Sequence, residues 1–405
     1  MELTSKLRKF LPRQNTASPH SSKKRNRRLD LDGQEIMTPY GACYVVEKSF
    51  PLSEYHGHWA LGKAYNNSYA CLEKLGQRPP KAFHMQNALF LDTETTGLAG
   101  GTGTYAFLVG LGTFTESNFI VKQFLMRDYN EELAMLYLLN KELKSKNTII
   151  SFNGKTFDLP LLQTRFTISR LPLEGAKGKD HLDLLHMARR LWRHKLASCS
   201  LNSLETHVLG ITRHDDIPGF EIPSRYFEFL HTGQGHILKQ VLDHNVIDIL
   251  SMATLSHRLA TTAKLKPEEC VCPWEAEALA KQAFSTRDYS LSLAYYTAAR
   301  NHSQNGEQYS RILHSTALIH KRMGQLDDAC LLWKKLLEVN ENDLLAHEEL
   351  AKYYEHRLKD LSSAQRVTKH ALAIAWSLRS PKASDFEHRL QRIDGKSKGK
   401  NHVNA

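Results

Sequence analysis

The sequence predicts a mixed α/β sheet covered by helices, followed by an all-helical repeat region. From residue 88, three apolar stretches with strand character precede a helically spaced segment and a fourth short strand. Helical patterns then dominate up to residue 262, as expected for one sheet with helices packed over it. Beyond residue 273, small and aromatic residues recur at a spacing of about 35, and strand patterns give way to helical ones.

Composition and charge limit the class of protein. The 405 residues suit two or three domains, and 41% hydrophobic with 24% charged residues is typical of globular proteins. No apolar run approaches the roughly 20 residues of a membrane-spanning helix. Six scattered cysteines form no disulfide framework, and the close pair Cys270 and Cys272 lacks the second pair of a zinc site. We therefore expect reduced cysteines and a cytoplasmic protein.

Both termini are basic. Residues 1–38 are predicted to be a disordered tail, and residues 1–28 alone carry +8 of the net charge of +11. This segment lacks the apolar core of a secretory signal, but a transit peptide remains an alternative. It suits attraction to nucleic-acid phosphates and equally suits a solvated terminus. Residues 381–405 are predicted to be a second loose basic tail.

The predicted elements follow in chain order. Residues 39–85 are mixed and include a helical stretch, "HGHWALGKAYNNSYACLEKLG". Strands are predicted at 88–92, 104–114, 118–126 and 147–152. Helices are predicted at 130–144, 156–168, 181–192, 201–209 and 237–259. Residues 39–262 thus form one domain, and 263–273 form a linker.

Residues 274–380 are predicted to be helical repeats. Ala329 and Ala364 are 35 residues apart, as are Trp333 and Thr368. A small residue where two helices cross, followed four positions later by a larger one, resembles the tetratricopeptide repeat (TPR). Such TPR-like repeats would stack into a short solenoid that docks a protein partner. An irregular helical bundle is the alternative.

Two acids mark the end of the first strand, in "ALFLDTETTG". Asp92 and Glu94 occupy positions i and i+2, so they face the same side of the strand. Adjacent anions either raise each other's pKa or require a cation, and a hard divalent metal is the natural one. The alternative is a solvated strand end in which each acid pairs with Lys or Arg.

Two later stretches supply further acids. In "SFNGKTFD", Thr156 is expected to cap a helix whose Asp158 faces back toward the strand ends. Asp158 alone could simply stabilise the helix dipole. In "LDHNVIDIL", His244 and Asp248 lie at i and i+4 and share one helix face.

The combination Asp92-x-Glu94, Asn153-x4-Asp158 and His244-x3-Asp248 resembles the DEDD 3′–5′ exonuclease superfamily of ribonuclease H-like fold. The third motif in that superfamily is Tyr-x3-Asp or His-x4-Asp, and here a His takes the Tyr spacing. The block "DTETTGLAGGTGTYAFLVGLG", the "HN" before the last Asp and the C-terminal repeats together resemble YprB-type proteins. The segments "SLNSLETHVLGI" and "IPGFEIPSRYF" resemble that family and polymerase proofreading domains.

The resemblance implies a metal-dependent 3′–5′ exonuclease acting on ends of single-stranded DNA or RNA, with two Mg²⁺ or Mn²⁺ ions. It makes Asp92, Glu94, Asp158 and Asp248 the metal ligands, with Glu94 also positioning the attacking water. His244 becomes the general base or the orienter of that water. An imidazole, with an ordinary pKa of about 6.5, is a better base at neutral pH than a phenol.

The resemblance also implies a substrate site. Its residues would be Thr95, Gly97, Leu98, Asn153 and Phe157, with core packing as the alternative for Phe157. A basic cluster could track the phosphate backbone or be a solvated face: Arg189, Arg190, Arg193, His194 and Lys195. Two other functions remain open, an oligonucleotidase and a non-catalytic adaptor that binds nucleic acid and docks a protein through its repeats.

Overall fold

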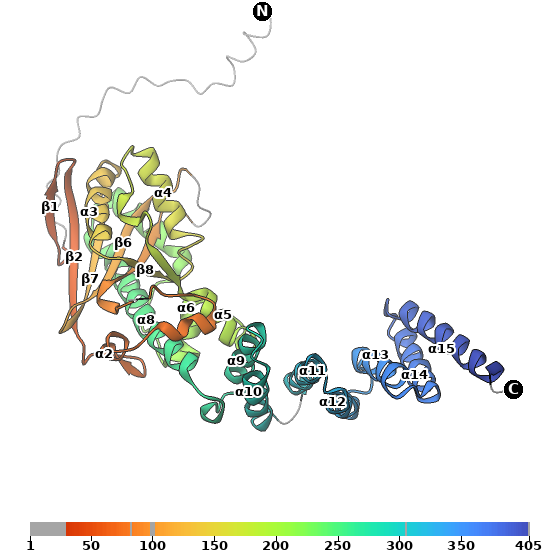
Figure 1. Cartoon of the computed structure of the whole chain (residues 1–405). Coiled ribbons are helices and arrows are strands. Elements are labelled where there is room, and N and C mark those ends of the chain that lie inside the picture. The colour runs from red at the N-terminus through yellow and green to blue at the C-terminus, as the bar shows by residue number, and fades with distance from the viewer. Residues whose placement is uncertain (1–29, 82, 98–101, 304–305, 404–405) are drawn as a thin grey trace, which may run out of the picture.

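The computed structural model describes residues 30–81, 83–97, 102–303 and 306–403. Figure 1 shows a sheet-containing body from which the C-terminal helices extend as a long arm. The body contains a seven-stranded sheet of order β1-β2-β7-β6-β5-β8-β9. Among the described residues, no helix combines the length and apolarity needed to cross a membrane.

The four predicted strands are confirmed. They are β5 (Ala88–Thr95), β6 (Ala106–Phe114), β7 (Asn118–Leu125) and β8 (Thr148–Ser151). Strand β5 runs antiparallel to β6 and parallel to β8, so it lies at the centre of the mixed sheet. It is three residues longer than predicted, which places Asp92 and Glu94 inside the strand.

Three further strands of the large sheet were not predicted. Strand β1 (Gln34–Thr38) pairs with β2 (Gly41–Pro51), and β2 pairs with β7. The prediction of a disordered tail over 1–38 is therefore wrong from Gln34 onward, and the first domain begins there rather than at residue 39. Strand β9 (Asp180–Asp183) overlaps the start of the helix predicted at 181–192. It forms because its pairing with β8 outweighs the weak strand character of "DHLD".

The segment between β2 and β5 is only partly helical. It contains the hairpin β3 (Tyr55–His56) and β4 (Trp59–Ala60), then α2 (Leu61–Tyr65) and the short η1 (Ala70–Leu75). A further short turn, η2 (Met85–Asn87), leads into β5.

Helices cover both faces of the sheet. On one face lie α3 (Glu132–Lys144), α4 (Asp158–Ile168) and α7 (Ile222–Thr232), packed on Leu89 and Leu91 of β5. On the other, α5 (Leu184–Trp192) and α8 (Lys239–Lys264) pack around Phe90. Asp92 and Glu94 follow the same alternation as Phe90 and thus face α8.

Two glycines of β6 bring α8 close to the sheet. A Cβ at Gly110 would lie 2.1 Å from Oδ1 of Asn245, and one at Gly112 would lie 2.5 Å from Cγ2 of Ile249. Gly110 pairs with Asp92 of β5 on one side and Gln123 of β7 on the other. The missing side chain therefore lets α8 approach the strand that carries the acids.

Shorter elements connect the main helices and strands of the body. Helix α6 (Leu201–Leu204) continues into a π-helical turn (Glu205–Leu209), where a helix over 201–209 was predicted. Between Lys264 and Pro273 the chain forms only the short turn η8 (Pro267–Glu269).

The C-terminal region is all-helical, as predicted. It comprises α9 (Pro273–Ser285), α10 (Tyr289–Asn301), α11 (Gly306–Arg322), α12 (Leu326–Val339), α13 (Leu344–Lys352), α14 (Leu361–Ser377) and α15 (Ala383–Val403). The four repeat positions, Ala329, Trp333, Ala364 and Thr368, are all buried between these helices.

The predicted tail over 381–405 is wrong, because most of it is α15. Phe386 and Ile393 of α15 are buried, and the fully buried carboxylate of Glu355 binds Arg389 and Arg392. Basic residues of this segment instead form ion pairs with Glu355 that hold α15 against the preceding helices.

Candidate active site

Three side chains form a compact group of possible metal ligands. Glu94 of β5 meets His244 and Asp248 of α8, and one donor atom from each lies within 4.8 Å of the other two. The close packing of α8 over β5 and β6 produces this meeting, so two predicted motifs 150 residues apart converge as expected.

Asp92 lies beside this group and is held by an amide chain. Its Oδ2 accepts from Nδ2 of Asn245 at 2.7 Å, and Oδ1 of Asn245 accepts from Gln123 at 2.9 Å. Gln123 also donates to the carbonyl of Leu242 at 2.8 Å. The orientation of Asp92 is therefore fixed from α8 and β7 together.

Asp158 approaches from the other predicted motif. It is the first residue of α4, is buried, and accepts a hydrogen bond from the hydroxyl of Thr93 on β5. The predicted cap is wrong: Phe157 occupies the N-cap position, and the hydroxyl of Thr156 binds back to Asn153. Asp158 is not a member of the 4.8 Å group, but its charge acts on both Asp92 and Glu94.

A buried acid that the sequence reasoning missed holds the loop before Asp158. Asp183 accepts from the backbone N–H groups of Asn153 at 2.9 Å and Lys155 at 3.1 Å, and it also caps α5 through Leu185. Asn153 adopts a left-handed conformation with φ of 68°, which Asn tolerates better than most residues. The position of Asp183 at the end of β9 was not predicted, because the sequence pattern there indicated a helix.

The four predicted metal ligands all have raised pKa values. Burial and the charges of Asp248 and Asp158 raise the pKa of Asp92, and burial with the charge of Asp92 raises that of Glu94. Burial raises the pKa of Asp158 to about 6 and also raises that of Asp248. Carboxylates that destabilise each other's charged form in this way fit a site for a hard divalent cation.

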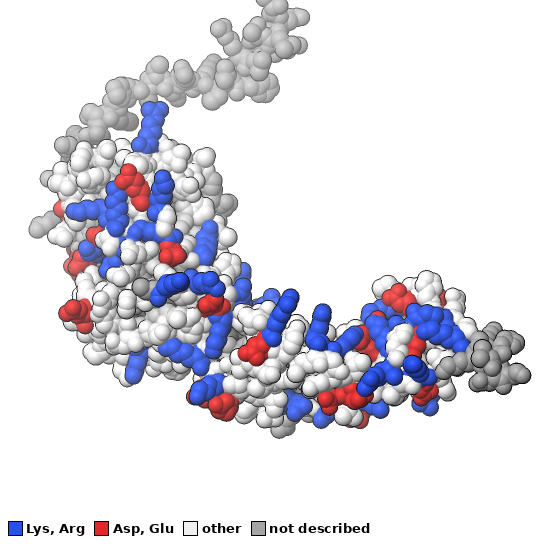
Figure 2. Space-filling view, in the orientation of Figure 1, with Lys and Arg blue, Asp and Glu red and all other residues white. Residues whose placement is uncertain are grey.

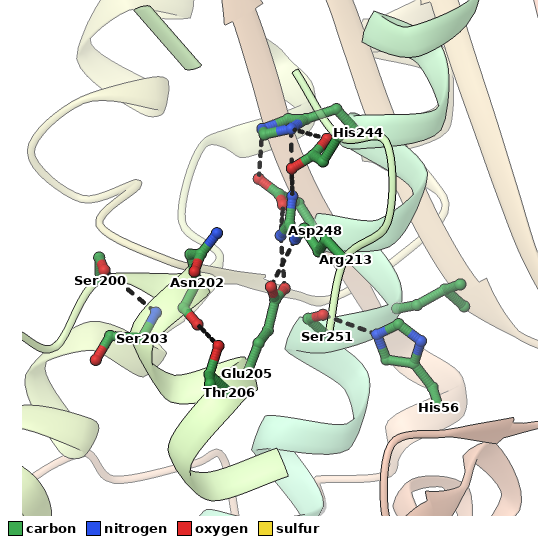
Figure 3. Close-up of polar contacts among 12 residues, drawn as sticks. His56, Ser200, Asn202, Ser203, Glu205, Thr206, Arg213, His244, Asp248 and Ser251 are labelled. Atoms are coloured by element: carbon green, nitrogen blue, oxygen red, sulfur yellow. Dashed lines mark hydrogen bonds and ion pairs between the residues drawn. The ribbon is translucent and has the colours of Figure 1, made fainter. Parts of the chain in front are cut away.

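An arginine that the sequence reasoning also missed lies in the cluster. Arg213 donates from Nε and Nη2 to both oxygens of Glu205 at 2.6 Å each, and from Nη2 to Asp248. Its Nη1 donates to Asp216 at 3.0 Å. Figure 3 shows Arg213 between Glu205 and Asp248, with His244 beyond. Arg213 lies in a loop, where no periodicity in the sequence indicated its role.

His244 is oriented by Asp216. Its Nδ1 lies 2.8 Å from Oδ1 of Asp216, and its Nε2 lies 3.7 Å from Oδ2 of Asp248. Burial alone would raise the pKa of Asp216, but the contacts from His244 and Arg213 give a net lowering. An ionised Asp216 only accepts hydrogen bonds and so favours the proton on Nδ1 of His244, although Nη1 of Arg213 also lies 3.2 Å from that atom. This tautomer leaves Nε2 as an acceptor toward the acids.

The predicted substrate residues are dispersed around this centre. Thr95 is buried and donates to the carbonyl of Gly97 at 2.8 Å, while Leu98 lies outside the described residues. Asn153 is exposed, and its side-chain oxygen accepts from Thr156 at 2.7 Å. Phe157 is half-buried and belongs to neither core cluster of the described part of the body, so core packing does not account for it.

A cavity of about 540 Å³ opens onto the cluster. His244 and Asp248 line it together with Asn202, Arg213 and residues of the segment 215–219. The two segments that resembled proofreading domains, 200–211 and 217–227, contribute Asn202 and the largely apolar part of this lining. Asp248 and His244 therefore border a space that a ligand can enter.

Comparison with known proteins identifies a family match, a relative and a similar solved structure. Residues 89–260 match the RNase_H superfamily. The chain is 31% identical over 366 residues to the uncharacterized protein YprB of Bacillus subtilis (strain 168), covering 87% of this chain and 86% of YprB. Among solved structures, the family B DNA polymerase of Pyrobaculum calidifontis matches with a TM-score of 0.36 and 13% identity. That match covers 51% of this chain and 30% of the polymerase chain.

Proposed function

We propose that this chain, which belongs to the YprB family, is a metal-dependent 3′–5′ exonuclease that hydrolyses phosphodiester bonds at single-stranded nucleic-acid ends. The ribonuclease H-like domain supports a nuclease in general terms. The observation that carries the proposal is the meeting of Glu94 with His244 and Asp248, the latter two lining a cavity. The charges of Asp92 and Asp158 act on the same group. A binding module has no need for such an accumulation of buried negative charge.

The acids would hold the metal ions. The proposed ligands are Asp92, Glu94, Asp158 and Asp248, which suit two Mg²⁺ or Mn²⁺ ions. Two such ions about 4 Å apart stabilise charge on both the attacking and the leaving oxygen of a phosphodiester. The amide of Asn245 and the hydroxyl of Thr93 keep two of these acids oriented before any ion binds.

His244 would act as the general base or would orient the water. Its Nε2 faces Asp248 and is the acceptor atom, because Nδ1 is committed to Asp216. Glu94, which lies in the same group, would orient that water. We place the terminal nucleotide near Thr95, Gly97, Leu98, Asn153 and Phe157, where the half-buried ring of Phe157 offers a surface for stacking a base.

The helical arm would serve a second role. We propose that the helices over 274–380 are TPR-like repeats that dock a protein partner, since the small and large repeat positions are buried where these helices pack. If the acids held no metal, the same arm would favour the alternative of a non-catalytic nucleic-acid-binding adaptor.

Degradation of end-labelled single-stranded DNA and RNA tests the function. The full chain would be assayed with Mn²⁺, Mg²⁺ or a chelator, beside Asp92→Asn. The control is Asp243→Asn, which makes the same change at a half-exposed acid of α8 that pairs with Lys48. Metal-dependent laddering lost only in Asp92→Asn would support the exonuclease, and the labelled end would show its direction. Equal inactivity of the wild type and Asp92→Asn with every metal would favour the adaptor.

A further inference from the structure

A second, basic cavity lies where the body meets the helical arm. It has a volume of about 250 Å³ and is formed by η1, α5 and α9. Its cationic lining comprises Lys74, Arg190, Arg193 and Lys281, with the imidazole of His194 beside them. We propose that this cavity, named here the junction pocket, binds the phosphate backbone of a single-stranded nucleic acid several nucleotides from the end that reacts. This inference rests on the proposed function, which supplies the nucleic acid.

The pocket holds Arg190 in a defined position. Its Nη1 donates to the carbonyl of Leu75 at the end of η1. The guanidinium lies so close to the next residue, Gly76, that a Cβ there would fall 1.4 Å from Nη1. Gly76 also has φ of 73°, a conformation that glycine adopts freely. The backbone thus makes room for the guanidinium, which is not simply a mobile surface side chain.

Three cations of the pocket are not neutralised by the described part of the chain. Nearby acids are engaged elsewhere, Glu73 with Arg78 and Glu275 with Arg258. Within the described ranges, Lys74, Arg190 and Arg193 have no carboxylate partner, and Lys281 shares Glu277 with an arginine of α11.

The electrostatic environment of His194 agrees with an excess of positive charge. Burial, followed by the charges of Lys281 and Arg193, lowers the pKa of this imidazole. Figure 2 shows Lys and Arg side chains over the junction between the body and the arm, interspersed with acids. An uncompensated positive pocket of this kind suits a phosphodiester, and the planar guanidinium matches its oxygens.

Helix α5 links the junction pocket to the candidate active site. Its N-terminus is capped by Asp183, the residue that also holds the loop before Asp158. Its C-terminus leads directly to Arg193. The nine residues of α5 span roughly 14 Å at 1.5 Å per residue. A stacked strand that advances about 3.4 Å per nucleotide would cover this distance in about four nucleotides.

Binding measurements on the full chain test the inference. Fluorescence anisotropy would compare labelled oligonucleotides of 3 and 12 nucleotides at several salt concentrations, with Ca²⁺ present. Arg190→Gln/Arg193→Gln should weaken binding of the 12-mer and reduce its salt dependence by about 0.7 per lost phosphate contact, hence by about 1.4. Affinity for the 3-mer should not change, because it cannot reach the pocket.

Two control variants test whether the effect is specific to the junction pocket and to its charge. Lys335→Gln/Lys369→Gln removes the same charge from exposed residues of the arm that form no ion pair within the described chain, and it should bind the 12-mer like wild type. Arg190→Lys/Arg193→Lys retains the charge and should retain most of the salt dependence. An unchanged salt slope in Arg190→Gln/Arg193→Gln, equal loss for both lengths, or no binding of the 12-mer by wild type would overturn the proposal.

The inference and the proposed function can fail separately. If wild type cleaves nucleic acid but the glutamine variant keeps the full salt slope, the exonuclease survives and the junction pocket does not. If wild type never cleaves but the slope falls as expected, the pocket stands as part of a binding protein.

Discussion

Arg213 donates a hydrogen bond to Asp248, so an acid proposed to hold a metal already has a cationic partner from its own chain. The same guanidinium donates hydrogen bonds to both carboxylate oxygens of Glu205, which is 1% exposed. Four of its N–H contacts therefore go to carboxylates of Glu205, Asp216 and Asp248. We infer that Arg213 positions these acids and has little donor capacity left for a phosphate.

Replacing Arg213 should destabilise the body strongly. Arg213→Met leaves Glu205 buried without its partner, and breaking a buried pair on one side costs about 3–5 kcal/mol. Glu205→Gln/Arg213→Met removes both charges and should recover much of that loss. Urea unfolding, followed by the fluorescence of the buried Trp192 of the body, would measure the free energy of unfolding of each variant.

Lys48→Met provides the control, because Lys48 pairs with Asp243 at a half-exposed site and its loss should cost about 0–1 kcal/mol. A double variant no more stable than Arg213→Met would contradict the pairing as the cause.

Stability should depend on pH through Asp158. Burial raises its folded pKa to about 6 from 3.8, so the fold favours the protonated acid. The stabilisation of the fold by protonated Asp158 is fully present below pH 3.8 and is lost as pH rises through about 6. A shift of roughly two units corresponds to about 3 kcal/mol.

In a chelator, Asp158→Asn should therefore be less sensitive than wild type to a rise in pH from 4 to 7. Thermal unfolding across this range measures the difference. Saturating Mn²⁺ should reverse this difference in pH sensitivity, because the ion stabilises the charged form of Asp158, which only wild type has. An identical pH profile for the two proteins would show that Asp158 is not held in its protonated form.

Asp216 should affect the chemical step more than substrate binding. Asp216→Asn replaces the acceptor for Nδ1 of His244 with an amide that can donate instead, which favours the wrong tautomer. If His244 is the base, we expect kcat to fall about 100-fold with KM little changed.

Steady-state hydrolysis of an end-labelled oligonucleotide would separate the two constants. Asp215→Asn is the control, because Asp215 adjoins Asp216 and lines the same cavity without a side-chain contact to His244 in the described chain. Equal loss of activity in both variants would indicate a general effect on this loop.

The predictability of the site differed between its parts for physical reasons. Asp92, Glu94, His244 and Asp248 lie on one strand and one helix, whose periodicities fix the direction of a side chain. Arg213 lies in a loop, where periodicity says nothing about direction, and its role appears only in the packed structure.

The edges of the fold were the least predictable. Strands β1 and β9 depend on pairing with distant neighbours, which local sequence does not reveal. The basic segment of α15 looked like a tail because its partner Glu355 lies about 35 residues away on another element.

Gly110 should be essential to the spacing of the site. Gly110→Ala places a Cβ 2.1 Å from Oδ1 of Asn245, the residue that orients Asp92 from α8. Either Asn245 turns away or α8 moves off the sheet, and such overpacking costs about 1–3 kcal/mol. We also expect a loss of Mn²⁺ affinity, since α8 carries Asp248 and β5 carries Asp92. Calorimetric titration with Mn²⁺ checks this beside Gly103→Ala, where a Cβ meets nothing within 4 Å. If Gly110→Ala bound Mn²⁺ as tightly as Gly103→Ala, close packing of α8 would not be what assembles the acids.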